Sequence, residues 1–64
     1  MSRARLMNDA KLAAAELTTA RQKLADAQFF ARNGMPNNLP FAEMVEHTAY
    51  HRWLRASTAL LANQ

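Results

Sequence analysis

The sequence contains no cysteine, so neither a disulfide bond nor a thiolate-bound metal ion can stabilise this chain of 64 residues. Its two histidines alone do not complete a four-coordinate zinc site. A chain this short forms one domain at most and buries a modest share of its surface, which leaves the folded state marginally stable. We therefore treat residues 1–64 as one domain and expect self-association to add stabilisation.

Long apolar runs are also missing, because no stretch approaches the roughly 18 residues that a membrane-spanning helix requires. The chain starts with basic residues, as a signal sequence does, but Asp9 and Lys11 interrupt the apolar segment that would have to follow. A helix lying on a membrane surface is disfavoured, since acidic residues are interspersed along the polar side of the first half. We expect a cytoplasmic protein without a membrane partner.

Charge of either sign is not concentrated in any run. Eight Lys and Arg residues against five Asp and Glu give a net charge of +3, spread along the chain. This balance fits a protein-binding chain as well as a nucleic-acid-binding one. The alternative of a nucleic-acid interface depends on arginines that dimerisation would have to bring together, namely Arg3, Arg5, Arg52 and Arg55.

Glycine and proline occur only between residues 34 and 40, which hold the single glycine and both prolines. Three asparagines in residues 33–38 accompany them. This composition predicts one loop, with Gly34 in the left-handed conformation that ends many helices. We expect helices over about residues 3–33 and 40–62, on either side of that loop.

The first half of the chain carries a heptad seam. Eight residues follow one another at alternating steps of four and three, namely Leu6, Ala10, Ala13, Leu17, Ala20, Leu24, Ala27 and Ala31. This period is that of an amphipathic helix that packs along another helix, and its many alanines allow a close approach. The second helix has a matching stripe formed by Val45, Ala49, Trp53, Ala56 and Leu60.

Folding at the loop gives an all-α antiparallel hairpin in which each small residue faces a larger one. The predicted pairs include Ala20 with Trp53 and Ala27 with Val45, an alternation of sizes that fills a helix interface well. Apolar residues remain on the second helix, namely Tyr50, Leu54 and Leu61. Burying each of them would contribute about 1.5–3 kcal/mol, so we predict a homodimer that forms a four-helix bundle through these three side chains.

Glu43, His47 and His51 recur every four residues, a spacing that can place a carboxylate and two imidazoles on one side of a helix. No other residue in the pattern supplies a further ligand, and we favour a solvent-exposed helix face with a Glu43–His47 pair. We expect no metal ion and no cofactor. An enzyme is not expected either, because two helices offer no cleft that shields a nucleophile from water.

The architecture is similar to that of the plasmid RNA-binding hairpin Rop and of the hairpin chaperones of type III secretion needles. The turn Pro36-Asn37-Asn38-Leu39-Pro40 resembles the Pro-x-x-Pro turn of needle subunits, with one residue more between the prolines. These resemblances imply a helical hairpin and assign a role to no residue. Small accessory proteins of phages and plasmids are often built in this way.

The function favoured by the sequence is a small non-enzymatic protein-binding module. As a homodimer it would inhibit, escort or modulate another protein, and a nucleic-acid-binding regulator is the alternative. Aromatic residues and methionine are typical of protein contacts. The candidate binding residues lie around the loop and are Phe29, Phe30, Met35, Leu39, Phe41 and Met44. Met7 and Leu12 near the open end of the hairpin are further exposed candidates.

Overall fold

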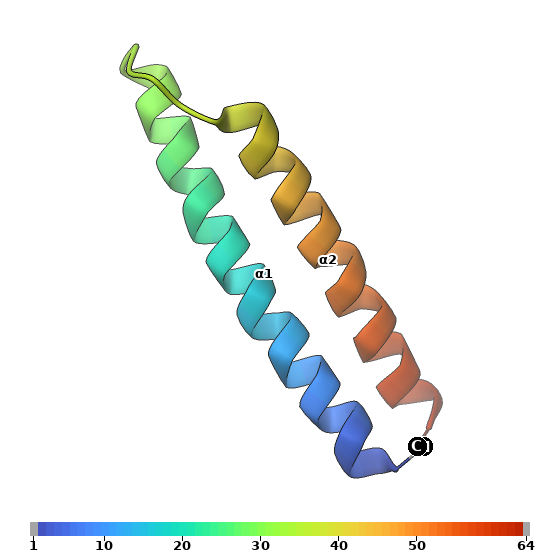
Figure 1. Ribbon diagram of the computed structural model, residues 1–64. Coiled ribbons are helices and arrows are strands. Elements are labelled where there is room, and N and C mark those ends of the chain that lie inside the picture. The colour runs from blue at the N-terminus through green and yellow to red at the C-terminus, as the bar shows by residue number, and fades with distance from the viewer. Residues whose placement is uncertain (1, 64) are drawn as a thin grey trace.

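The computed structural model describes residues 2–63 and shows two helices, α1 over Arg3–Arg32 and α2 over Leu39–Ala62. They lie side by side and antiparallel along their whole length (Figure 1), in a rod of 48 × 13 × 12 Å. Residues 2–63 contain no strand. The predicted all-α hairpin over 3–33 and 40–62 is confirmed. Only the two helix ends beside the loop differ from the prediction, each by one residue.

Neither helix in this part of the chain combines the length and the apolar character needed to cross a membrane.

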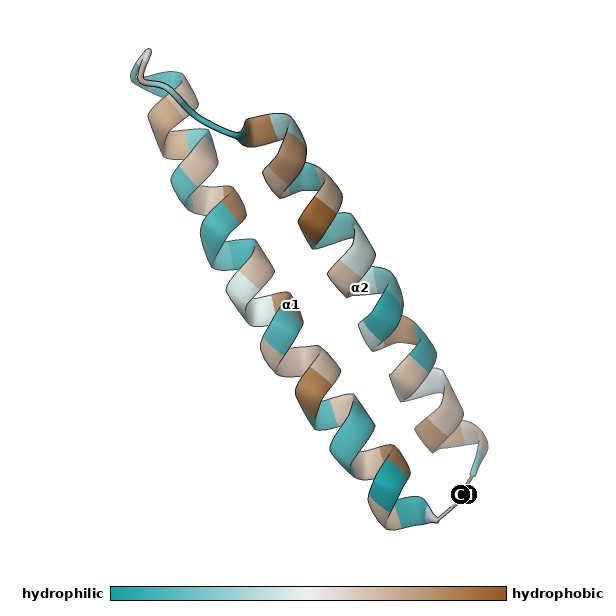
Figure 2. Ribbon diagram, in the orientation of Figure 1, coloured by the Kyte–Doolittle hydropathy of each residue, from teal (hydrophilic) through white to brown (hydrophobic). Residues whose placement is uncertain are grey.

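The heptad seam of α1 is confirmed in full, because all eight of its residues are buried or half-buried. Outside the seam, Ala14 is the only residue of α1 that is not exposed. Hydrophobic residues recur along the whole length of both helices, whereas the segment that enters α2 is hydrophilic (Figure 2). The period of the sequence therefore identifies the packed side of α1 correctly.

The stripe predicted on α2 also faces α1. Ala49 is buried, and Val45, Trp53, Ala56 and Leu60 are half-buried. Ala42, one step nearer the loop, extends this buried stripe and was not part of the prediction. The core is thin, since no large side chain in residues 2–63 is fully buried.

Hydrogen bonds to the ends of α1 explain where this helix begins and ends. Ser2 caps the start, where its Oγ accepts from the backbone N–H of Arg5 at 3.2 Å. At the other end Gly34 has φ +68°, and the N–H of Met35 donates to the carbonyl of Phe30 at 2.9 Å. The N–H of Gly34 donates to the carbonyl of Ala31 at 3.2 Å, which completes a Schellman motif.

The start of α2 is organised by Asn37. Its Oδ1 accepts from the backbone N–H of Leu39 at 3.0 Å, and its Nδ2 donates to the carbonyl of Met35 at 3.1 Å. Asn38 occupies the N-cap position without a side-chain hydrogen bond to the helix, and Pro40 lies in the first turn. The helix thus begins at Leu39, because the Asn37 side chain satisfies its free N–H.

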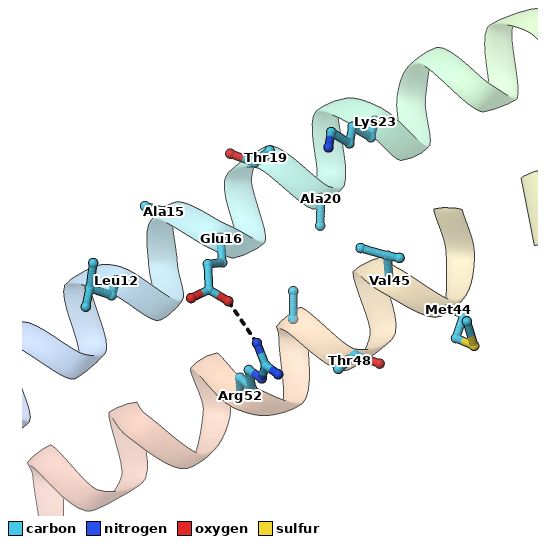
Figure 3. Close-up of a pocket in the computed structure, with 11 residues that line it drawn as sticks. Leu12, Ala15, Glu16, Thr19, Ala20, Lys23, Met44, Val45, Thr48 and Arg52 are labelled. Atoms are coloured by element: carbon cyan, nitrogen blue, oxygen red, sulfur yellow. Dashed lines mark hydrogen bonds and ion pairs between the residues drawn. The ribbon is translucent and has the colours of Figure 1, made fainter. Parts of the chain in front are cut away.

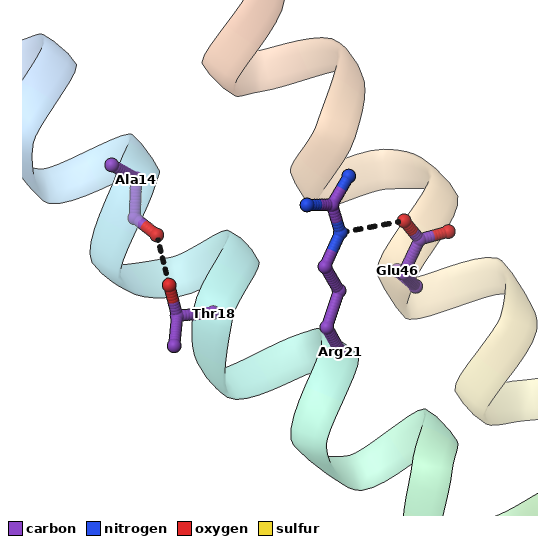
Figure 4. A network of polar contacts seen from close by, with 4 residues as sticks. All are labelled: Ala14, Thr18, Arg21 and Glu46. Atoms are coloured by element: carbon purple, nitrogen blue, oxygen red, sulfur yellow. Dashed lines mark hydrogen bonds and ion pairs between the residues drawn. The ribbon is translucent and has the colours of Figure 1, made fainter.

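The residues that face each other across the hairpin differ from the predicted pairs by about one helical turn. An ion pair joins Arg52 to Glu16 at 3.2 Å, and another joins Arg21 to Glu46 at 3.5 Å (Figure 4). Both contacts place Ala20 level with Ala49 rather than with Trp53.

The reason for this shift lies in the loop. The Schellman motif folds residues 34–38 back beside the last turn of α1, so α2 begins below the end of α1 (Figure 1). The strict alternation of small and large partners is therefore wrong at the centre. There Ala20 and Ala49 form a cluster with Leu17, and the larger residues Val45, Tyr50 and Trp53 pack around that cluster.

We predict that Ala20→Leu destabilises the hairpin by about 1–3 kcal/mol, because Ala20 is 4% exposed and lies against Ala49, which is 5% exposed. The free energy of unfolding is to be measured by chemical denaturation followed by circular dichroism. Ala25→Leu is the matched control, since Ala25 is an exposed residue of the same helix. Equal stabilities of the two variants would contradict the central alanine contact.

A second prediction concerns Gly34, whose positive φ is unfavourable for any residue with a Cβ atom. Gly34→Ala should lower the stability by about 1–2 kcal/mol through backbone strain alone, because no atom lies within 4 Å of the added Cβ. Gly34→Asn should lose less, since asparagine tolerates the left-handed region. Thermal unfolding curves of the two variants test this order.

Candidate protein-binding surface

Large apolar side chains are more abundant on the surface of the hairpin than in its core. Nine of them are exposed in residues 2–63, whereas five of the seven buried residues are alanines. The nine are Met7, Leu12, Phe29, Phe30, Met35, Phe41, Met44, Leu54 and Leu61. Isolated exposed apolar residues are ordinary, so the arrangement of these side chains matters more than their number.

Four of the nine lie around a groove that runs between the helices. Its central hollow has a volume of about 510 Å³, with Leu12 on the α1 side and Met44 on the α2 side (Figure 3). A second hollow of about 650 Å³ lies beside the loop and is lined in part by Phe30 and Phe41. The two hollows share Lys23 and Val45, so they adjoin along one face of the hairpin, and we call them together the groove.

The polar part of the groove is small. The Glu16–Arg52 ion pair bridges the helices across the central hollow (Figure 3), and Lys23 and Asp26 line the hollow beside the loop. These four charges cancel, although the whole chain carries +3. A largely apolar groove whose charges cancel suits a protein partner better than a polyanion.

The structure brings only some of the predicted binding residues together. Phe30 and Phe41 line the hollow beside the loop, and Met44 lies at the border of the central hollow. Phe29 is exposed and contacts the ring of Phe30 edge to face at 5.8 Å, without lining either hollow.

The remaining two binding candidates are exposed to different degrees. Met35 is an exposed loop residue, and Leu39 is half-buried at the start of α2. Leu12, one of the two exposed candidates near the open end, lines the central hollow. Leu12 on α1 and Met44 on α2 lie at opposite ends of the central hollow (Figure 3).

The three residues predicted for a dimer interface differ in their surroundings. Tyr50 is half-buried and packs against the cluster of Leu17, Ala20 and Ala49, so the single chain already uses much of its surface. Its ring lies 6.0 Å from that of Trp53. Leu54 and Leu61 are 41% and 65% exposed, and their apolar surface is available to another molecule.

The arginines of the nucleic-acid alternative do not form one patch with free charge. Arg52 is held by Glu16, while Arg3 and Arg5 lie at the start of α1 and Arg55 lies in the second half of α2. Arg21 is paired with Glu46 on the other side of the seam (Figure 4). The Glu16–Arg52 pair is exposed, whereas Glu46 is half-buried; pairs this close to the surface contribute about 0.2–1 kcal/mol to stability.

The histidines on α2 contact each other. The Nε2 atoms of His47 and His51 lie 3.1 Å apart, and both side chains are exposed. The predicted Glu43–His47 pair is not among the ion pairs of residues 2–63, and the second histidine takes the place of the carboxylate. Within the same range, no group of three or more His, Asp and Glu side chains is placed to hold a metal ion.

Comparison of the chain with protein families, with curated proteins and with solved structures found no match, so the function must be argued from the residues themselves.

Proposed function

We propose that this hairpin is a non-enzymatic module that binds another protein in its groove and acts as a homodimer. The observation that carries the proposal is the pair of adjoining hollows, which places Leu12, Phe30, Phe41 and Met44 along one face. Phe41 is 61% exposed, and a partner that covers it and its neighbours removes apolar surface from water. Hydrophobic grooves of this kind commonly bind the apolar face of a partner's amphipathic helix.

The homodimer uses the outer side of α2, and Met44 is the groove residue that this side shares. Leu54 and Leu61 are exposed on α2 near the open end of the hairpin, away from the loop where Phe30 and Phe41 lie. A second copy that covers the two leucines and the outer edge of Tyr50 forms the four-helix bundle expected from the sequence. The part of the groove beside the loop, which Phe30 and Phe41 line, then stays open to a partner, as an escort or inhibitor requires.

A test of the homodimer is sedimentation equilibrium at micromolar concentration. We expect the wild-type chain to be a dimer and Leu54→Glu to be a monomer of unchanged helix content, because a buried carboxylate opposes the interface. Leu12→Glu is the matched control: it places the same charge in the groove and should leave the dimer intact. A wild-type monomer, or a Leu54→Glu dimer as stable as the wild type, contradicts the proposed homodimer.

Partner binding is tested by affinity purification from the native host with three baits, namely the wild-type chain and two variants. A protein bound in the groove should be retained by the wild-type chain at several hundred millimolar salt and after nuclease treatment. It should be lost from the double variant Phe30→Ser/Phe41→Ser and retained by Phe29→Ser, whose side chain lies outside the hollows. Retention that disappears with nuclease or moderate salt would support the nucleic-acid alternative instead.

A further inference from the structure

The two histidines of α2 already have the spacing of metal ligands. Their rings lie on successive turns with centroids 4.4 Å apart and planes at 76°, and their Nε2 atoms are 3.1 Å apart. Zinc binds imidazole nitrogen at about 2.0–2.1 Å, so two nitrogens of a tetrahedral site lie about 3.3 Å apart. Small ring rotations therefore bring both Nε2 atoms to bonding distance from one ion.

Tyr50 packs against the histidine pair and limits the movement of the His51 ring. The ring of Tyr50 contacts His51 edge to face at 5.6 Å, and Tyr50 is itself half-buried against the core. At this Nε2–Nε2 distance one ring donates its N–H in a hydrogen bond to the nitrogen of the other. Metal binding needs both rings to carry their proton on Nδ1, a change of tautomer that leaves both imidazoles neutral.

The histidine pair lies at the centre of a second heptad stripe, which α2 presents on the side opposite its core stripe. The members of this outer stripe are Pro40, Met44, His47, His51, Leu54, Thr58 and Leu61. Every one of them is exposed. The outer stripe is therefore a seam without a partner in the single chain.

The outer stripe complements itself when two α2 helices lie antiparallel and cross at the level of residue 49. Met44 of one copy then faces Leu54 of the other, and His47 faces His51. Beside the stripe, Glu43 faces Arg55, an opposite charge, and neither is used by the ion pairs within residues 2–63. An apolar contact, an imidazole contact and a charge contact thus agree on one alignment, which identifies a second copy of this chain as the occupant.

We propose that His47 and His51 of two antiparallel copies bind one divalent transition-metal ion of the zinc class. Each chain supplies two of the four imidazole ligands that a closed tetrahedral site needs, so the site is incomplete without the second copy. The proposal rests on the proposed homodimer and specifies its contact surface. Metal binding then holds the dimer together at its centre, and loss of the metal weakens it.

The test uses the full-length chain, freed of metal with EDTA and titrated with zinc chloride. Calorimetry should give one zinc ion per two chains, and sedimentation should show the dimer dissociation constant falling at least tenfold at saturation. EDTA should reverse both effects. His47→Ala and His51→Ala should each abolish the zinc response without loss of helix content, whereas Glu43→Gln should keep the stoichiometry, because the carboxylate is not a ligand.

The antiparallel alignment has its own test in the absence of zinc. Glu43→Arg should weaken the dimer because it places two like charges together, and the double variant Glu43→Arg/Arg55→Glu should restore it. Failure of the double variant to recover the dimer would overturn the alignment.

Other outcomes separate the two proposals. One zinc ion per chain without a change in mass would overturn the shared site. A stable dimer that takes up no zinc would overturn the metal site and leave the proposed homodimer standing. A chain that stays monomeric with and without zinc would overturn both.

Discussion

The close contact between two alanine-rich helix faces is the interaction on which the rest of the molecule depends. Ala20 and Ala49 meet at the centre with less than a tenth of their surface exposed, and the adjacent larger residues pack around them. Small side chains let the helix axes approach closely, and dispersion contacts extend along the whole interface. Because the buried residues are mostly alanines, nine large apolar side chains lie on the surface of the described residues and are available to other molecules.

Much of this fold is predictable because helix period and helix ends are local properties. The seam from Leu6 to Ala31 follows from spacing alone, and Gly34 marks the end of α1 through its conformational freedom. The role of Asn37 is harder to predict, because Asn37 and Asn38 both precede α2 and the geometry of the loop decides which side chain caps it.

The alignment of the helices and the groove were harder to predict. Matching by size paired Ala20 with Trp53, but alanines accept several neighbours, so size alone does not choose among alignments one turn apart. The Schellman motif and the ion pairs of Glu16 and Arg21 indicate the alignment of the helices that is observed. The groove depends on that alignment, which is why Leu12 was not associated with Met44 from the sequence.

The folded-back loop has a mechanical consequence for the hairpin. An alanine seam has few large side chains that would resist sliding of one helix along the other. Shifts by one helical turn, about 5.4 Å, are a known mode of helix motion. Here the short connection from Arg32 to Leu39 acts as a tether that limits such travel. The loop therefore sets which turns of α1 and α2 share the groove, and its length tunes the shape of the surface offered to a partner.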